Sequence, residues 1–315
     1  MIRYGKFNDI LNLCFAIMGI CFLFMYPANC IEAAKDGLTT ALYIALPSIF
    51  PFMVLSKFII AGNLHYIISE FIGKPFEFLF GINKKYAVIF VLGCIGGYPI
   101  GAITINEMLQ KKEISARDAQ YLLGFCNNCG PMFIIGTVGS ILLNNATYGY
   151  VLYIIHILCV ILCGIIMRLF FKHSPENFDI YLKKTKNPSP LSSSVTSSGI
   201  AMINIGSYII IFSVIASFVI KIFGNTNSYV LSGILCFLEI TTGIKFASSV
   251  ALPELYKISL ISAAIGFSGL CVFSQSKAVF ENIKISFFKY FFAKIIIAVL
   301  SFILTYTVFT IIFSH

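Results

Sequence analysis

Two stretches that combine Gly, Pro and Asn interrupt long apolar segments, and they could build a binding site inside a membrane. They are residues 94–102 (CIGGYPIGA) and 125–136 (FCNNCGPMFIIG). A broken helix frees backbone N–H and C=O groups that hydrocarbon cannot satisfy, so such breaks persist only where they line a cavity within protein. A helix that restarts at Pro99 or Pro131 would direct free N–H groups and its positive dipole end into that cavity, which favours an anion.

We therefore expect both breaks to contact a substrate, with Asn127 or Asn128 serving as a helix cap or ligand contact. The alternative is a pair of helix kinks where neighbouring helices pack closely. However, each break combines several helix-breaking residues where one would suffice. The substrate-binding residues expected in the two breaks are Gly96, Gly97, Tyr98, Pro99, Asn127, Asn128 and Gly130.

A single carboxylate, Glu239, lies deep in an apolar segment of the second half of the chain. A carboxylate in lipid is costly unless a proton or a partner neutralises it, so Glu239 predicts a proton relay, a coupling-cation ligand or a substrate contact. The alternative is a hydrogen-bond network that orders the helix bundle. Polar residues of this half that we expect at the same site are Thr241, Thr242, Ser268 and Gln275.

The composition indicates an all-α polytopic membrane protein. Of 315 residues, 58% are hydrophobic and 11% are charged, and the mean hydropathy is +0.92. A soluble domain of this length could not bury so much apolar surface. The formal net charge of +9 comes from Lys and Arg scattered through loops, which argues against a nucleic-acid partner.

Other chemistry finds little support in the sequence. Cys126 and Cys129 have the spacing of a redox or zinc pair, but no second pair follows, so we expect neither a metal nor another cofactor. No hydrolase, metalloprotease or nucleotide-binding motif is present. We therefore expect a protein that is not an enzyme and whose transport, if any, is secondary or passive.

The apolar segments fall into two halves with the same order of elements. The first half has segments at 38–60, 86–110, 119–143 and 148–171, and the second at 200–223, 228–249, 257–275 and 291–313. Residues 65–80 resemble an interfacial helix. Interrupted segments at corresponding positions are typical of transporters built from inverted repeats. The domains that we expect are an N-terminal transmembrane helix in 1–36, a first repeat in 37–171, a cytoplasmic linker in 172–198 and an inverted repeat in 199–315.

The distribution of basic residues favours an inverted topology. Cytoplasmic loops are enriched in Lys and Arg. If 86–110 and 228–249 are re-entrant hairpins and the other segments cross, most of the 22 basic residues, Lys294 among them, lie on the side of the N-terminus. This topology has seven crossings and two hairpins, and its broken segments meet near the midplane.

Five motifs together resemble a known family, from about residue 38 to the C-terminus. They are PSIFPF (47–52), GGYPIGA (96–102), NNCGPMFIIG (127–136), LEITTG (238–243) and GFSGLCVFSQ (266–275). The chain resembles sporulation integral membrane proteins of the YlbJ type, which contain the nucleoside-recognition, or Gate, domain. The resemblance implies a fold similar to concentrative nucleoside transporters, with re-entrant hairpins and discontinuous helices. It also implies a role in moving dipicolinate across the outer forespore membrane.

The residues and the resemblance together predict a secondary transporter of a small anionic solute in a bacterial cell membrane. The helix N-termini and asparagine amides suit carboxylates, and Glu239 could carry a coupling proton. A nucleoside or other small-metabolite transporter and a non-transporting sporulation scaffold are the alternatives. Expected partners are the anion and the lipid bilayer. A homo-oligomer and other sporulation membrane proteins remain open as further partners.

Overall fold

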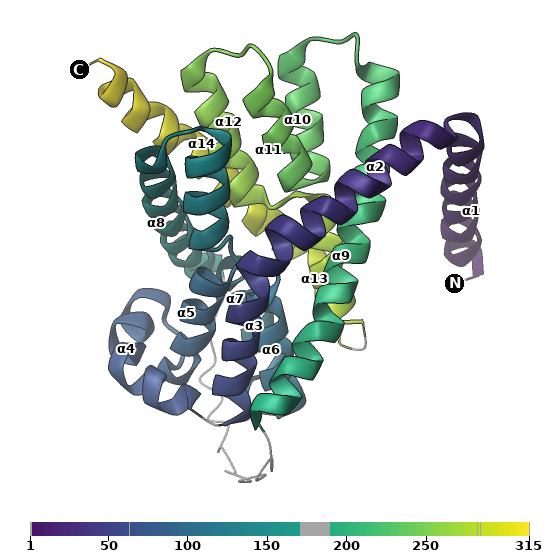
Figure 1. The fold of residues 1–315 in the computed structure, drawn as a ribbon. Helices are drawn as coiled ribbons and strands as arrows, with labels where there is room; N and C mark the ends of the chain where they lie inside the picture. The colour runs from purple at the N-terminus through teal and green to yellow at the C-terminus, as the bar shows by residue number, and fades with distance from the viewer. Residues whose placement is uncertain (1, 63, 171–189, 282, 284, 315) are drawn as a thin grey trace.

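The described part of the chain is entirely helical, which confirms the predicted all-α class (Figure 1). A computed structural model describes residues 2–62, 64–170, 190–281, 283 and 285–314. Helices satisfy their own backbone hydrogen bonds, as spans in lipid require. Within these residues, five helical segments are long and apolar enough to cross a membrane: Pro27–Ala61, Ala146–Phe170, Pro190–Phe223, Glu254–Val279 and Phe287–Phe313. A bent pair, His65–Phe80 with Lys84–Gly96, meets at 111° and would make a sixth.

The first long path joins α2 (Pro27–Thr40), the π-helical turn η1 (Ala41–Ala45) and α3 (Leu46–Ala61). It starts at Pro27, after α1 (Ile2–Met25), so the expected boundary at 36/37 falls inside α2, and the division into domains stays a prediction. Pro47 and Pro51 do not break the path. Proline has no backbone N–H, so these two residues remove two hydrogen-bond donors from the helix. The wider π-helical turn just before them accommodates the loss, and the helical path continues.

Next comes α4 (His65–Phe80), whose bounds match the predicted interfacial segment. It exposes Phe71 and Phe78, and it ends at Gly81, which has φ +65°. The short η2 (Lys84–Tyr86) then leads into α5. A helix that bends away from its successor and exposes aromatic side chains suits the edge of a bilayer.

The remaining helices of the first half form a hairpin, a broken helix and one long helix. Helices α5 (Ala87–Gly96) and α6 (Ile100–Gln110) pack against each other. The chain then rises through α7 (Ala116–Cys126) and the π-helix η3 (Met132–Leu142) and returns along α8 (Ala146–Phe170) (Figure 1).

The second half shows the same order. After α9 (Pro190–Phe223), helices α10 (Ser228–Leu238) and α11 (Ile240–Ser249) pair, α12 (Glu254–Phe267) continues into α13 (Gly269–Val279), and α14 (Phe287–Phe313) ends the chain. The hairpin of α10 and α11 lies at the top of Figure 1, whereas that of α5 and α6 lies at the bottom.

Two sequence-based expectations need correction here. Residues 190–198, expected in the linker, belong to α9, while the rest of that linker, 172–189, lies outside the described residues. Lys294, expected on the side of the N-terminus, is buried within α14. Its neighbours on both sides are apolar, so the helix simply continues through it. The seven-crossing topology, which needs α1 and the broken helix of α7 and η3 as crossings, stays a prediction.

Candidate functional site

Four interruptions of the helices lie in two packed pairs. In the first half, the gap between α5 and α6 packs against the gap between α7 and η3. A Cβ atom built on Gly97 would lie 3.2 Å from the backbone nitrogen of Gly130. In the second half, a Cβ atom on Gly269, where α12 gives way to α13, would lie 3.1 Å from the nitrogen of Ile240 in the other hairpin. Glycine is needed at Gly97 and Gly269 both for this approach and for φ values of +83° and +79°.

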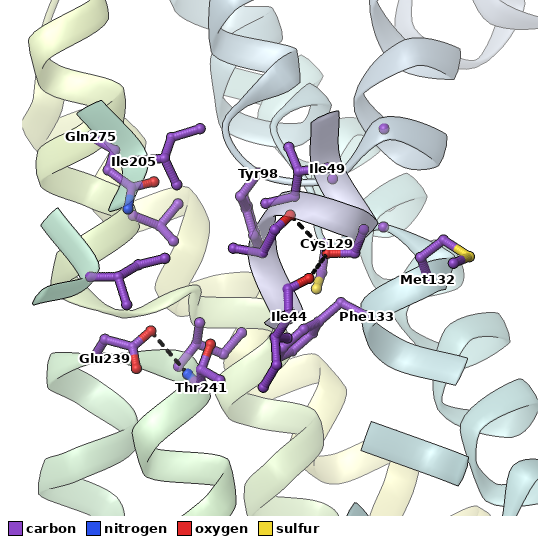
Figure 2. Close-up of a pocket in the computed structure, with 18 residues that line it drawn as sticks. Ile44, Ile49, Tyr98, Cys129, Met132, Phe133, Ile205, Glu239, Thr241 and Gln275 are labelled. Atoms are coloured by element: carbon purple, nitrogen blue, oxygen red, sulfur yellow. Dashed lines mark hydrogen bonds between the residues drawn. The ribbon is translucent and has the colours of Figure 1, made fainter. Parts of the chain in front are cut away.

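A cavity opens where these two pairs face each other. Its empty volume is about 600 Å³, which includes the open space at its mouth. Figure 2 shows Tyr98 and Cys129 on one side of it and Glu239 with Thr241 on the other. We call this space the central cavity. It is lined by Ile44, Ala45, Ser48, Ile49, Gly96, Gly97, Tyr98, Cys129, Gly130, Met132, Phe133, Ile205, Ile209, Glu239, Ile240, Thr241, Val272 and Gln275.

Glu239 supplies a carboxylate to this wall and caps a helix at the same time. It is extended, 2% exposed and sits between α10 and α11. Its Oε1 accepts the backbone N–H of Thr241 at 3.0 Å, and its Oε2 accepts that of Thr242 at 2.6 Å. The positive end of α11 thus stabilises a carboxylate in an otherwise apolar segment. No described basic side chain lies within 4.0 Å of it.

Asn127 lies at the junction of the two halves. Its Oδ1 accepts the N–H of Ala102 in the first turn of α6, at 3.3 Å. Its Nδ2 donates to Ser276 Oγ at 2.9 Å and to the Tyr290 hydroxyl at 2.8 Å. The amide therefore caps α6 and ties it to α13 and α14, and both of its N–H donors are already used within the protein.

Lys294 is a functional candidate that sequence reasoning missed. It is the one buried Lys or Arg among the described side chains, and it is 1% exposed. Its ammonium donates to the carbonyl of Asn127 and, at 3.3 Å, to the hydroxyl of Tyr98. Tyr98 donates in turn to the carbonyl of Ile265 near the end of α12, at 3.1 Å. A basic residue inside an apolar run was the available signal, because such residues are functional by default in membranes.

Two further polar groups lie buried beside the first pair of breaks. Asn128 donates to the carbonyl of Phe125 at 2.7 Å, while its Oδ1 has no hydrogen-bond partner. His156 of α8 accepts the N–H of Cys129 through Nε2 at 3.3 Å. This bond requires a lone pair on Nε2, so the imidazole is neutral here and acts as an interhelical partner.

The structure brings most of the expected site residues to one place, but not all to the cavity wall. Those in the wall are Gly96, Gly97, Tyr98, Gly130, Glu239, Thr241 and Gln275. Those outside it are Asn127, Asn128, Thr242, Ser268 and Pro99. The helix expected at Pro99 does begin there, but Asn127 already caps it. The helix expected at Pro131 begins at Met132, and its first turn does face the cavity.

One wall of the cavity comes from the proline-containing path of the first half. Ile44, Ala45 and Ser48 lie in and just after η1. Ser48 Oγ donates to the carbonyl of Ile44 at 2.6 Å, which gives a carbonyl of the π-helical turn a hydrogen-bond donor. The PSIFPF motif (47–52) marked this segment in the sequence, but it gave no signal for a π-helical turn that faces the site.

A second cavity adjoins the central one and shares Ile205 and Gln275 with it. Pro99, Asn106 and Glu107 line this second cavity, where Lys57 lies 3.8 Å from the Glu107 carboxylate. Both cavities therefore lie against the side chains of Ile205 and Gln275.

The comparison with curated proteins gives one informative match. The chain is 26% identical to the sporulation integral membrane protein YlbJ of Bacillus subtilis (strain 168), over 93% of this chain and 80% of that protein. This chain is a homologue of the YlbJ-type sporulation membrane proteins. The resemblance to YlbJ-type proteins is thereby confirmed, while the Gate domain stays a prediction. Together with the apolar spans, the match makes the chain an integral membrane protein. No family model matches the chain, and no solved structure matches it significantly.

Proposed function

We propose that this chain is a secondary transporter of a small anionic solute, with dipicolinate during spore formation as the first candidate. The observation that carries the proposal is one cavity between two packed pairs of helix breaks, with a carboxylate in its wall. Breaks at matching positions in two halves are the strongest pointer to a transporter site near the midplane. The match to a sporulation membrane protein supports the biological setting.

The arrangement of the halves supports alternating access. The hairpins approach the central cavity from opposite ends of the bundle (Figure 1), and α2 and α3 pack along α9. This is the relationship expected of inverted repeats, and rocking of one half against the other would expose the cavity to each side in turn.

The chemistry of the wall favours a carboxylate over a neutral solute. The first turn of η3 presents its positive end to the cavity through Gly130, Met132 and Phe133. In the other half, the chain itself places the carboxylate of Glu239 on a helix N-terminus. When Glu239 is protonated, the cavity loses a negative charge and accepts an anion more readily. Coupled movement of a proton and an anion follows.

Uptake into proteoliposomes tests the proposal. Purified protein should give saturable uptake of calcium-free dipicolinate that exceeds uptake of uridine. Preference for uridine would favour a nucleoside transporter instead. Uptake of neither solute, by protein shown to be folded and inserted, would favour a scaffold.

A further inference from the structure

The buried ammonium of Lys294 has no anionic partner among the residues that the structure describes. Its ammonium contacts the Asn127 carbonyl, the Tyr98 hydroxyl and the faces of Tyr98 and Tyr290, whose ring centroids lie 4.9 Å and 5.6 Å away. All are neutral dipoles or aromatic faces. Among the described residues, no carboxylate lies within 4.0 Å of Lys294.

Such a charge is expensive to hold in a membrane. Removing an ammonium from water costs several kcal/mol, which hydrogen bonds and cation–π contacts offset only in part. Intramembrane cations normally pair with an acid or face a water-filled cavity. Lys294 lies next to the central cavity, because its ammonium donates a hydrogen bond to the hydroxyl of Tyr98, which lines that cavity.

We propose that Lys294 determines the charge selectivity of the central cavity. The inference rests on the proposed function, since it assumes that a solute occupies this cavity. The ammonium lies behind the wall formed by Tyr98, so its positive charge acts through the wall without direct contact. A solute anion in the cavity then supplies the counter-charge that the protein does not. Lys294 is a specificity-determining residue, and Tyr98 and Asn127 hold it in place.

A purely structural role predicts something different. If Lys294 only holds α14 against the first pair of helix breaks, its replacement lowers the affinity for every ligand by the same factor. If its charge selects the ligand, the loss of binding free energy is proportional to the charge of the ligand, because Coulomb energy is proportional to that charge. The ratio of the affinity losses for different ligands therefore distinguishes the two roles, whereas a change in protein stability does not.

The experiment measures equilibrium binding of three probes to the full-length purified protein: dipicolinate (a dianion), picolinate (a monoanion) and uridine (neutral). Lys294→Met should weaken dipicolinate binding by about 100-fold, picolinate by about 10-fold, which is the square root of that factor, and uridine by less than about 2-fold. Lys294→Arg keeps the charge and should keep the ratio of the two anions. Lys221→Met, which removes a lysine lying over the Tyr26 ring, is the matched control and should change nothing.

Lys294→Gln replaces the methionine variant if that one does not fold, because glutamine can still donate to the Asn127 carbonyl. Equal losses for dipicolinate and picolinate in a folded variant would overturn the selectivity role while leaving the proposed function intact. A wild-type protein that prefers uridine, or binds none of the three probes, would overturn the anion-carrier proposal and this inference with it.

Discussion

Gly97 and Gly130 lie backbone to backbone where the hairpin of α5 and α6 meets the gap between α7 and η3. A Cβ on Gly130 would lie 3.0 Å from the Gly97 nitrogen, and one on Gly97 would lie 3.2 Å from the Gly130 nitrogen. Two interrupted helices can therefore touch without side chains between them. This contact holds the first pair of breaks together and places both at the central cavity.

Gly97→Ala should destabilise the protein by about 1–3 kcal/mol, because φ +83° with ψ 172° belongs to a region that only glycine occupies at low cost. Thermal unfolding in detergent measures the effect. Gly136→Ala is the matched control, since a Cβ there would meet nothing within 4 Å. Similar unfolding temperatures for the two variants would show that the Gly97 contact is not needed.

Glu239→Gln should preserve folding and flatten the pH dependence of dipicolinate uptake. Glutamine can accept one of the two N–H groups that hold the carboxylate now, but it cannot exchange a proton. Uptake by the variant and the wild type would be compared across a pH series. Glu254→Gln, at an exposed carboxylate 3.4 Å from Lys257, is the control. A pH profile unchanged from wild type would reduce Glu239 to a helix cap.

Asn127→Leu should cost more stability than Asn128→Leu. Asn127 makes three hydrogen bonds that join α6, α13 and α14, so its loss should lower the free energy of unfolding by about 2–4 kcal/mol. Asn128 donates to one carbonyl and, at 3.5 Å, to the Cys94 sulfur, which suggests a loss of about 1 kcal/mol. Unfolding in mixed micelles compares the two variants. The opposite ranking would contradict the role assigned to Asn127.

The inverted topology predicts that the start of α9 and the end of α14 lie on opposite sides of the membrane. Single cysteines at Ser193 and Ser314 in a cysteine-free variant should react with impermeant thiol reagents from opposite faces. Inverted and right-side-out vesicles supply the two faces. Labelling of both positions from the same face would rule out an odd number of crossings between them.

The sequence predicted the hairpin and broken-helix segments well because Gly, Pro and Asn clusters have strong local consequences. Both ends of α4 and both breaks of the first half follow from such local signals. Glu239 was predicted for a similar reason, since an acid in an apolar run is visible without a structure. Its role as the cap of α11 is also local, because its carboxylate accepts the backbone N–H groups two and three residues later.

Long-range contacts were not predictable in this way. Asn127 was expected to be a helix cap or a ligand contact. It does cap α6, but its other two bonds go to residues 149 and 163 positions away. Lys294 was counted on the side of the N-terminus because it lies close to the start of the expected segment 291–313. The helix begins earlier, at Phe287, which places Lys294 deeper inside it. The π-helical turn that brings Ile44 to the cavity also depends on packing against α9, which no local pattern reveals.

A blocking experiment at Ser48 decides whether the solute passes through the central cavity. Ser48 lines the cavity, and Ser207 is an exposed residue whose hydroxyl makes the same bond to the carbonyl four residues earlier. Each is changed to cysteine in a cysteine-free variant that retains uptake, and then alkylated with a bulky maleimide. Alkylation at Ser48→Cys should abolish dipicolinate uptake, with dipicolinate slowing the reaction, while alkylation at Ser207→Cys should do neither. Full uptake after complete alkylation of Ser48→Cys would contradict passage through this cavity.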